Sequence, residues 1–341
     1  MKIILAISTR NNKILSIDKS LSALGCEVSL LTMDDYTNQS SYIEKKLDDW
    51  GFFGRRKQFE KQRKMKLLSM VNQQDYDLIL WINSPAGVLD LEEFYAIGKK
   101  IQQVIWFVDG VSEHQDILPY AKQANRVGCF EYCDVAYLKE YDVHNVIYCP
   151  IGYNEAYEYM EVGSRDIDIV FVGSPFKNRL CMLEPLAKEA CRHNWRLEIY
   201  GPFWESMYFW KRWIFKYKYP SLYKFVHNES LLPEKVAEIY GKAKICLNIH
   251  DEKHKSPNPR FFEILKSGAM QLCDTRGNYV DKLFPQKALD VFSDGKSLIS
   301  MVEYYLANES KRRMLSEYGK NNVLYSMRYS LRRLLEGIIN I

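Results

Sequence analysis

The sequence has no long hydrophobic run. Among its 341 residues, no segment approaches the 18 or more apolar residues of a typical membrane-spanning helix. The apolar start, residues 1–8 (MKIILAIS), is too short for a secretory signal peptide and is followed at once by polar residues. We therefore expect a cytoplasmic protein.

A disulfide framework and a strong net charge are also absent. The eight cysteines are scattered, and Cys129 and Cys133 are the only close pair. Such spacing favours buried thiols, because a zinc site of paired cysteines would need a second pair. The net charge of +4 is nearly balanced, which argues against a protein built to bind nucleic acid.

What the sequence does contain is an alternation of short apolar segments with segments of helical spacing. In the first half the predicted strands are 2–8, 27–33, 77–83, 103–109, 135–138 and 146–149. In the second half they are 166–173, 196–201, 244–249, 270–273 and 288–292, followed by a helical tail. This alternation is typical of parallel sheets covered by helices, so we predict an α/β protein.

A turn-rich break at residues 150–155 (PIGYNE) separates the two series of strands. Two domains also fit the length of the chain. We predict two Rossmann-like domains, 1–155 and 156–325, that face a central cleft. The last segment, 326–341, is predicted to be a helix that packs back on the first domain.

The segment Ser256–Asp274 (SPNPRFFEILKSGAMQLCD) is the most informative part of the chain. Pro259 and Gly268 are typical of the first helical turn and of the residue after the last turn. A helix N-terminus that follows a parallel strand and carries an arginine, here Arg260, suits a phosphate or diphosphate. Glu263, one turn further, can accept hydrogen bonds from sugar hydroxyls.

A second strand, turn and helix start occupies residues 168–179 (DIVFVGSPFKNR). Gly173 permits close backbone approach, and Lys177 and Arg179 can hold phosphate oxygens. The alternative is an ordinary turn whose basic residues face water. Because both segments follow strands of one predicted sheet, we expect them at one crevice. Tyr200 and Gly201 close the next strand in a tight turn that either faces the ligand or is only a turn.

Two patterns resemble metal sites. Asp166 and Asp168 form a DxD pair, but they precede a strand, whereas metal ligands of this kind should follow one. His250 and His254 are four residues apart, but the residue after the first is Asp251, where a hydrolytic zinc helix has Glu. We interpret the first pattern as a solvated strand start and the second as a loop lining the cleft, and we expect no metal.

Candidate groups for proton removal lie in the first half. Asp109 ends a predicted strand, where a general base would be placed, and Glu113 and His114 follow it. The imidazole of His114 is suited to taking up a proton near neutral pH. The alternative is that Asp109 and Ser112 only form a turn and a helix cap.

Residues 52–66 and 203–219 mix aromatic and basic side chains. Trp, Tyr and Lys together suit a membrane interface or a polyanionic acceptor, so peripheral membrane contact is one interpretation. At helical spacing, Phe209, Trp210, Trp213 and Tyr217 would share a face. The alternative is an insertion packed on the core with a solvated basic edge. We favour this alternative for 203–219, and the two interpretations are balanced for 52–66.

The order and spacing of these pieces resemble the CgeB-like branch of group 1 glycosyltransferases, which have the GT-B fold. The pieces are 106–109, 148–152, 168–173 with Arg179, 199–201, 243–250, 258–263, 268–269 and Asp274. The resemblance implies an N-terminal acceptor domain and a C-terminal domain for a nucleoside-diphosphate sugar, with no metal or other cofactor. We predict sugar transfer to a saccharide or lipid-linked saccharide in bacterial cell-envelope polysaccharide or glycoconjugate assembly.

By the same resemblance, Glu263 would bind the ribose, Arg179 and Arg260 the diphosphate, and Asn258 would shape the loop beside the sugar. We also place His250, Phe261, Lys177, Tyr200 and Gly201 at the donor.

The sequence also departs from the family pattern. Lys255 stands eight positions before Glu263, where many retaining relatives have a second Glu, so the stereochemistry stays open. Residues 8–12 (STRNN) replace the usual glycine-rich loop. The alternatives are a nucleotide-sugar epimerase, a non-catalytic nucleotide-sugar-binding or scaffold protein, and a membrane-surface or polyanion-binding protein.

Overall fold

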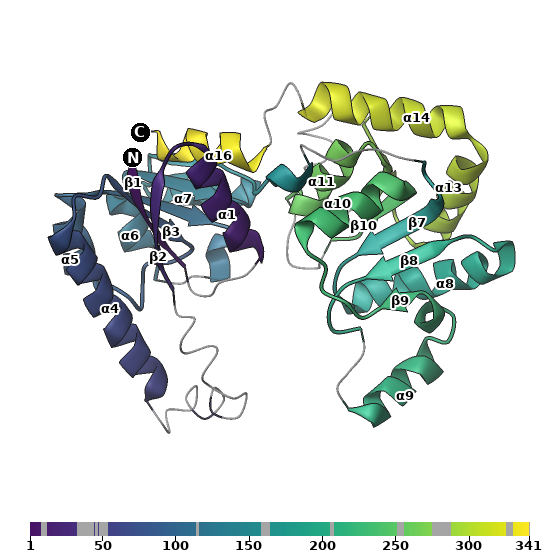
Figure 1. Cartoon of the computed structure of the whole chain (residues 1–341), viewed down its shortest axis with the longest axis horizontal. Coiled ribbons are helices and arrows are strands. Elements are labelled where there is room, and N and C mark those ends of the chain that lie inside the picture. The colour runs from purple at the N-terminus through teal and green to yellow at the C-terminus, as the bar shows by residue number, and fades with distance from the viewer. Residues whose placement is uncertain are drawn as a thin grey trace. The chain divides into compact units, whose positions relative to one another are not determined.

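A computed structural model divides the chain into two compact units, Met1–Ile151 with Leu331–Ile341, and Gly152–Ser330. The structure describes residues 1–7, 12–32, 44, 47, 54–113, 116–157, 164–204, 208–250, 256–274, 288–324 and 330–340. The chain passes from one unit to the other after Ile151 and after Ser330, a few residues from the predicted boundaries at 155 and 325. Each unit has its own six-stranded parallel sheet (Figure 1).

The sheet of the first unit has the strand order β2-β1-β3-β4-β5-β6. Its inner strands are apolar on both sides because helices cover both faces. The strands are β1 (Lys2–Ala6), β2 (Glu27–Leu31), β3 (Leu78–Ile82), β4 (Gln102–Phe107), β5 (Arg126–Cys129) and β6 (Val146–Tyr148). The helical segments are α1 (Asn12–Ala23), α4 (Arg55–Gln73), α5 (Leu91–Gly98), η1 (Val111–Glu113), α6 (Leu118–Gln123), α7 (Tyr132–Glu140) and α16 (Leu331–Ile339).

One predicted strand of this unit is wrong. Residues 135–138 lie in α7, and the strand beside β4 is β5 instead. A run of four apolar residues fits a buried helix as well as a strand, so periodicity could not decide. Gly128 weakens the strand signal of β5, yet α16 requires it. A Cβ at this position would lie 2.3 Å from Cδ1 of Ile338.

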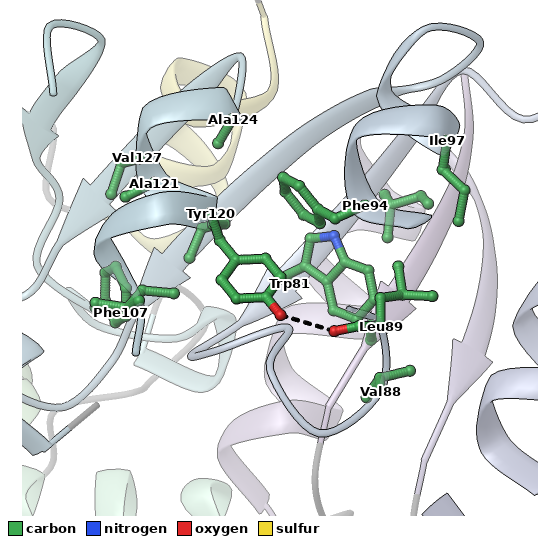
Figure 2. Close-up of a cluster of buried hydrophobic side chains, with 14 of the residues drawn as sticks. Trp81, Val88, Leu89, Phe94, Ile97, Phe107, Tyr120, Ala121, Ala124 and Val127 are labelled. Atoms are coloured by element: carbon green, nitrogen blue, oxygen red, sulfur yellow. Dashed lines mark hydrogen bonds between the residues drawn. The ribbon is translucent and has the colours of Figure 1, made fainter. Parts of the chain in front are cut away.

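Aromatic side chains fill the core on one face of the first sheet (Figure 2). Phe94 packs edge-on against Tyr120, with 5.2 Å between ring centroids. Two polar side chains of this core are paired: the Tyr120 hydroxyl donates to the carbonyl of Leu89 at 2.8 Å, and Nε1 of Trp81 donates to Oε1 of Gln103 at 3.0 Å. These bonds avoid the cost of burying unpaired polar groups.

The helix α16 belongs to the first unit. In Figure 1 it lies beside α1, and it also contacts β5. Its apolar face, Leu331, Leu335, Ile338 and Ile339, is buried among side chains of the first sheet.

The second unit has the strand order β12-β11-β10-β7-β8-β9. Its strands are β7 (Ile167–Val172), β8 (Leu197–Tyr200), β9 (Val226–His227), β10 (Ala243–Asn248), β11 (Met270–Asp274) and β12 (Asp290–Phe292). Its helical segments are η2 (Glu155–Tyr157), α8 (Lys177–His193), α9 (Phe209–Lys218), η3 (Leu222–Lys224), α10 (Pro233–Lys242), α11 (Pro259–Ser267), α13 (Gly295–Ala307), α14 (Glu309–Tyr318) and the π-helical η4 (Gly319–Leu324). The two-residue strand β9 was not predicted.

The chain order reverses at β7. The next strands, β8 and β9, lie on one side of β7, and the later strands β10 to β12 lie on the other. The connections that leave β7 and β10 therefore run in opposite directions, which is the arrangement that forms a ligand crevice in open parallel sheets. Ligands of open parallel sheets bind at such a reversal point.

The favoured interpretation of residues 203–219 as a packed insertion is wrong for much of α9. Trp210, Trp213 and Tyr217 are exposed, whereas Phe215 and Tyr219 pack against the core. The side chain of Phe209 lies outside the described residues. Separately, none of the helices in the described parts of the chain is both long enough and apolar enough to cross a bilayer.

Candidate functional site

The helix α11 begins and ends as its sequence predicts. Asn258 caps its first turn, because its Oδ1 accepts the backbone N–H of Phe261 at 3.0 Å, and Pro259 is the first helical residue. Gly268 ends it in the left-handed conformation, with φ 67°. Nδ2 of Asn258 also donates to Oδ1 of Asn248 at 2.9 Å. The start of α11 is thereby fixed to the end of β10.

Asn248 is the centre of a buried polar chain. Its Oδ1 also lies 3.4 Å from Nη1 of Arg260, and its Nδ2 donates to Oε1 of Gln271 at 3.0 Å. Nε2 of Gln271 donates to the carbonyl of Phe261 at 3.2 Å. Sequence reasoning missed Asn248 and Gln271, which were treated as ordinary strand residues. Their signal is a polar side chain within an otherwise apolar strand.

Two guanidinium groups meet at Gly173, the residue after β7. A Cβ at Gly173 would lie 2.8 Å from Nη2 of Arg260 and 3.2 Å from Nη1 of Arg179. Both guanidinium carbons also lie over the ring of Phe171, at 5.3 Å for Arg260 and 5.5 Å for Arg179. The structure therefore brings together the predicted residues Gly173, Arg179 and Arg260 at the point where the strand order reverses.

Arg179 joins the two loops that border the crevice. Its Nε donates to the carbonyl of Ile249 after β10, and its Nη1 donates to the carbonyl of Ser174 after β7, both at 3.0 Å. Its side chain is buried, with the guanidinium 4.6 Å from the ring centre of Phe176. Lys177, at the first turn of α8, is exposed. Arg179 thus holds the two loops together, while the guanidinium group of Arg260 lies beside Gly173.

Gly201 and Trp204 position the backbone of Gly173. The N–H of Gly173 donates to the carbonyl of Tyr200, and Nε1 of Trp204 donates to the carbonyl of Gly173, both at 2.8 Å. Gly201 has φ 149°, and a Cβ there would lie 2.3 Å from the carbonyl oxygen of Gly173. The ring of Tyr200 stacks on His227 of β9 at 4.5 Å. Burial, reinforced by the charge of Glu198, raises the pKa of Tyr200.

His250 follows β10 and pairs with Asp274 at the end of β11. Nδ1 of His250 lies 2.6 Å from Oδ1 of Asp274, and the backbone N–H of His250 donates to Oδ2 at 3.1 Å. Both side chains are buried, and Nε2 of His250 has no hydrogen-bond partner within the described structure. Asp274 closed a predicted strand, but its partner was not foreseen. His254 and Lys255 lie outside the described residues.

Among the described residues, two groups of side chains could hold a metal ion. One is His250 with Cys273 and Asp274, and the other is Glu189, His193 and Glu303 on α8 and α13. The predicted DxD pair lies at the amino end of β7 and is engaged in ion pairs. Asp166 contacts Arg196 and Asp168 contacts Lys244, each at 2.6 Å.

Glu263 lies on α11 one turn after Arg260, next to two buried tyrosines. Burial raises the pKa of Tyr157 and of Tyr240 well above the usual value, and the charge of Glu263 raises both further. The charge of Arg260 opposes this effect at Tyr240. The carboxylate of Glu263 therefore lies close to these two tyrosines.

In the first unit, Asp109 lies just beyond the carboxyl end of β4, partly exposed. Its Oδ2 accepts Nδ2 of Asn83 at 3.1 Å. The turn η1 that follows is tied elsewhere, since the N–H of Val111 donates to Oδ2 of Asp134 at 2.7 Å. The side chain of Glu113, all of His114 and residues 8–11 lie outside the described residues.

Comparison with known proteins agrees with this fold. Residues 179–336 match the model of a family described as glycosyl transferase-like. The chain has the GT-B fold. It is similar over 99% of its length to sucrose-phosphate synthase from Thermosynechococcus elongatus, with 97% of that chain covered, 15% identity and a TM-score of 0.67. It is also similar over 99% of its length to Anabaena HepE in complex with UDP and glucose, with 98% of that chain covered, 14% identity and a TM-score of 0.64.

A more distant likeness is to a Listeria monocytogenes protein described as a candidate UDP-N-acetylglucosamine 2-epimerase. There the identity is 10%, the TM-score 0.57, and 96% of this chain and 95% of that chain are covered. No curated protein matches this GT-B chain in sequence. The predicted resemblance to GT-B glycosyltransferases is confirmed by the family match and the fold, and the CgeB-like branch stays a prediction.

Proposed function

We propose that this protein is a glycosyltransferase that moves a hexosyl or related sugar from a nucleoside-diphosphate donor to an acceptor. The observation that carries the proposal is the meeting of Arg260 and Arg179 at Gly173. It lies where the strand order of the second sheet reverses, beside the N-terminus of α11. A diphosphate suits this place because guanidinium groups and a helix N-terminus both bind anionic oxygens.

The same groups would act on the reaction. When the sugar leaves, negative charge grows on the diphosphate, and donors already in position stabilise that charge without reorganisation. Arg260 and the start of α11 supply this charge stabilisation, while Arg179 keeps the two bordering loops in place. Glu263 is proposed to hold the ribose and Asn258 to shape the loop beside the sugar. The complex of HepE with UDP and glucose supports a uridine nucleotide as the first donor to test.

On the acceptor side, Asp109 is proposed as the general base, with Glu113 and His114 as further candidates. The proposed acceptor is a saccharide or lipid-linked saccharide of the bacterial cell envelope, reached from the cytoplasm. The diphosphate charge is proposed to be met without a metal ion.

The test compares the whole protein with Arg260→Ala in assays of nucleoside-diphosphate release from a panel of donors and acceptors. Removal of one preorganised donor costs about 10²–10³ in turnover, so a loss of at least that size is expected. Arg192→Ala is the matched control, because Arg192 is an exposed arginine of α8 whose described contact is with Glu189. Full activity of Arg260→Ala would contradict the assignment.

An epimerase is the second candidate, supported by the likeness to the Listeria protein. An epimerase would convert the nucleotide sugar with no acceptor present. The transferase would release one nucleoside diphosphate for each sugar that it transfers to the acceptor. A non-catalytic binding or scaffold protein would bind the donor and turn over no acceptor in the panel.

A further inference from the structure

The helix α9 exposes a stripe of large apolar side chains. Trp210, Trp213, Ile214 and Tyr217 follow the spacing i, i+3, i+4, i+7, which places them on one helical face. Their exposed fractions are 48%, 68%, 47% and 79%. We call these four residues the outer face of α9. Single exposed apolar residues are ordinary, but a contiguous group of them marks an interaction site.

The outer face is built on an anchored helix. Phe215 and Tyr219 pack against the core of the second unit, and the rings of Phe215 and Tyr223 lie 6.3 Å apart. Figure 1 shows α9 at the margin of this unit. On the outer face, the rings of Trp213 and Tyr217 stack at 5.9 Å and 13°. The stacked pair is therefore held toward solvent by contacts on the opposite side of the helix.

Basic side chains lie on both sides of α9, with Lys211 beside the outer face and Lys216 over the ring of Tyr223 on the anchored side, at 5.4 Å. α9 carries Lys211, Arg212, Lys216 and Lys218, all exposed, and its sequence has no acidic residue. Nζ of Lys211 lies 5.2 Å from the ring centres of both Tyr208 and Trp210. A short amphipathic helix with aromatic side chains on one face and Lys and Arg beside them is typical of proteins that lie in the headgroup region of a bilayer.

We propose that the outer face of α9 binds the surface of an anionic lipid bilayer. The indole and phenol rings would enter the headgroup region, and the positive charge of α9 would be attracted to the lipid phosphates, which it complements. A nucleic acid could bind the cations, but it has no apolar region to cover Ile214, whereas a bilayer has one. The proposal does not rest on the proposed function, although a lipid-linked acceptor would lie at the same surface.

The experiment is co-sedimentation of the full chain with vesicles of phosphatidylcholine alone or mixed with phosphatidylglycerol. The protein is expected to sediment with the anionic vesicles. Lys211→Gln with Lys216→Gln is expected to lower the partition coefficient about 25-fold, at about fivefold for each cation near an anionic surface. Trp213→Ser with Tyr217→Ser is expected to lower it about tenfold, through lost burial of apolar area.

Tyr95→Ser with Lys99→Gln is the matched control. These residues form an exposed aromatic–cation pair at 4.5 Å on another part of the chain, so their replacement should leave binding unchanged. All variants should keep the melting temperature and the UDP binding of the parent protein, which separates this proposal from the nucleotide site.

Two results would overturn the proposal. The first is equal sedimentation with neutral and anionic vesicles, or no sedimentation with either. The second is a loss of binding in the charge variant alone, while the aromatic variant sediments with anionic vesicles as the parent does. That pattern would identify a polyanion surface instead of a bilayer contact.

Discussion

At Gly173 the site depends on the absence of a side chain. The guanidinium groups of Arg179 and Arg260 approach the space that a Cβ would occupy, and Phe171 lies beneath both. The glycine turn and both arginines could be predicted from the sequence, because each has a local signal. The pairing of His250 with Asp274 could not, since the register of β10 and β11 brings together two residues that are far apart in the chain.

Gly173→Ala should weaken the binding of UDP about tenfold or more and leave the fold intact. The added methyl group would displace Arg260, whose Nη2 would lie only 2.8 Å away, and the side-chain end can move where backbone cannot. Isothermal titration of UDP, with a melting curve for each variant, measures both effects. Gly337→Ala is the control, because a Cβ at Gly337 meets open space. Unchanged UDP affinity in Gly173→Ala would separate the arginine pair from the nucleotide site.

At the scale of elements, apolar patterning predicted most of the strands but could not resolve short or ambiguous segments. Residues 135–138 form helix and not strand, and β9 contains two residues, too few to give a pattern. The sequence around α9 also led to a wrong prediction of a packed insertion, because aromatic residues usually indicate burial. Phe215 of α9 and Tyr219, the residue after the helix, pack against the core, while the outer face is exposed.

The helix α16 is expected to stabilise the first unit strongly. Leu335 is fully buried among side chains of the first sheet, so Leu335→Ala removes apolar contacts and leaves a cavity. We expect a loss of about 2–5 kcal/mol in the free energy of unfolding of this unit, measured by urea titration. Arg332→Ala, on the exposed side of the same helix, should change it by less than about 0.5 kcal/mol. Equal effects of the two substitutions would show that α16 contributes little to the core.

At the scale of the whole molecule, both sheets reverse their order beside their first strand, β1 in one unit and β7 in the other. This arrangement follows from strands joined by helical crossovers, which have one strongly preferred handedness, so the alternation in the sequence was enough to predict two Rossmann-like units. The chain of hydrogen bonds through Asn248 and Gln271 could not be predicted in this way, because it forms only in the assembled sheet. It depends on side chains of neighbouring strands that no local pattern relates.

The balance of charge in the second unit leads to a last prediction, on metal dependence. If Arg260 and the start of α11 neutralise the diphosphate, sugar transfer should keep its rate in excess EDTA. The structure also offers an alternative, because His250, Cys273 and Asp274 place ligand atoms within 4.8 Å of one another. Turnover measured with EDTA, and again after adding Mg²⁺, Mn²⁺ or Zn²⁺, distinguishes transfer without a metal ion from transfer that needs one.

A loss in EDTA that one of these ions restores would contradict the arginine mechanism. His250→Ala then locates the ion, since removing a ligand should abolish the restoration. If the rate is unchanged by EDTA and His250→Ala lowers it, the pair of His250 and Asp274 acts by holding the end of β10 against β11. In that case the pair would support the loop that Arg179 binds at Ile249.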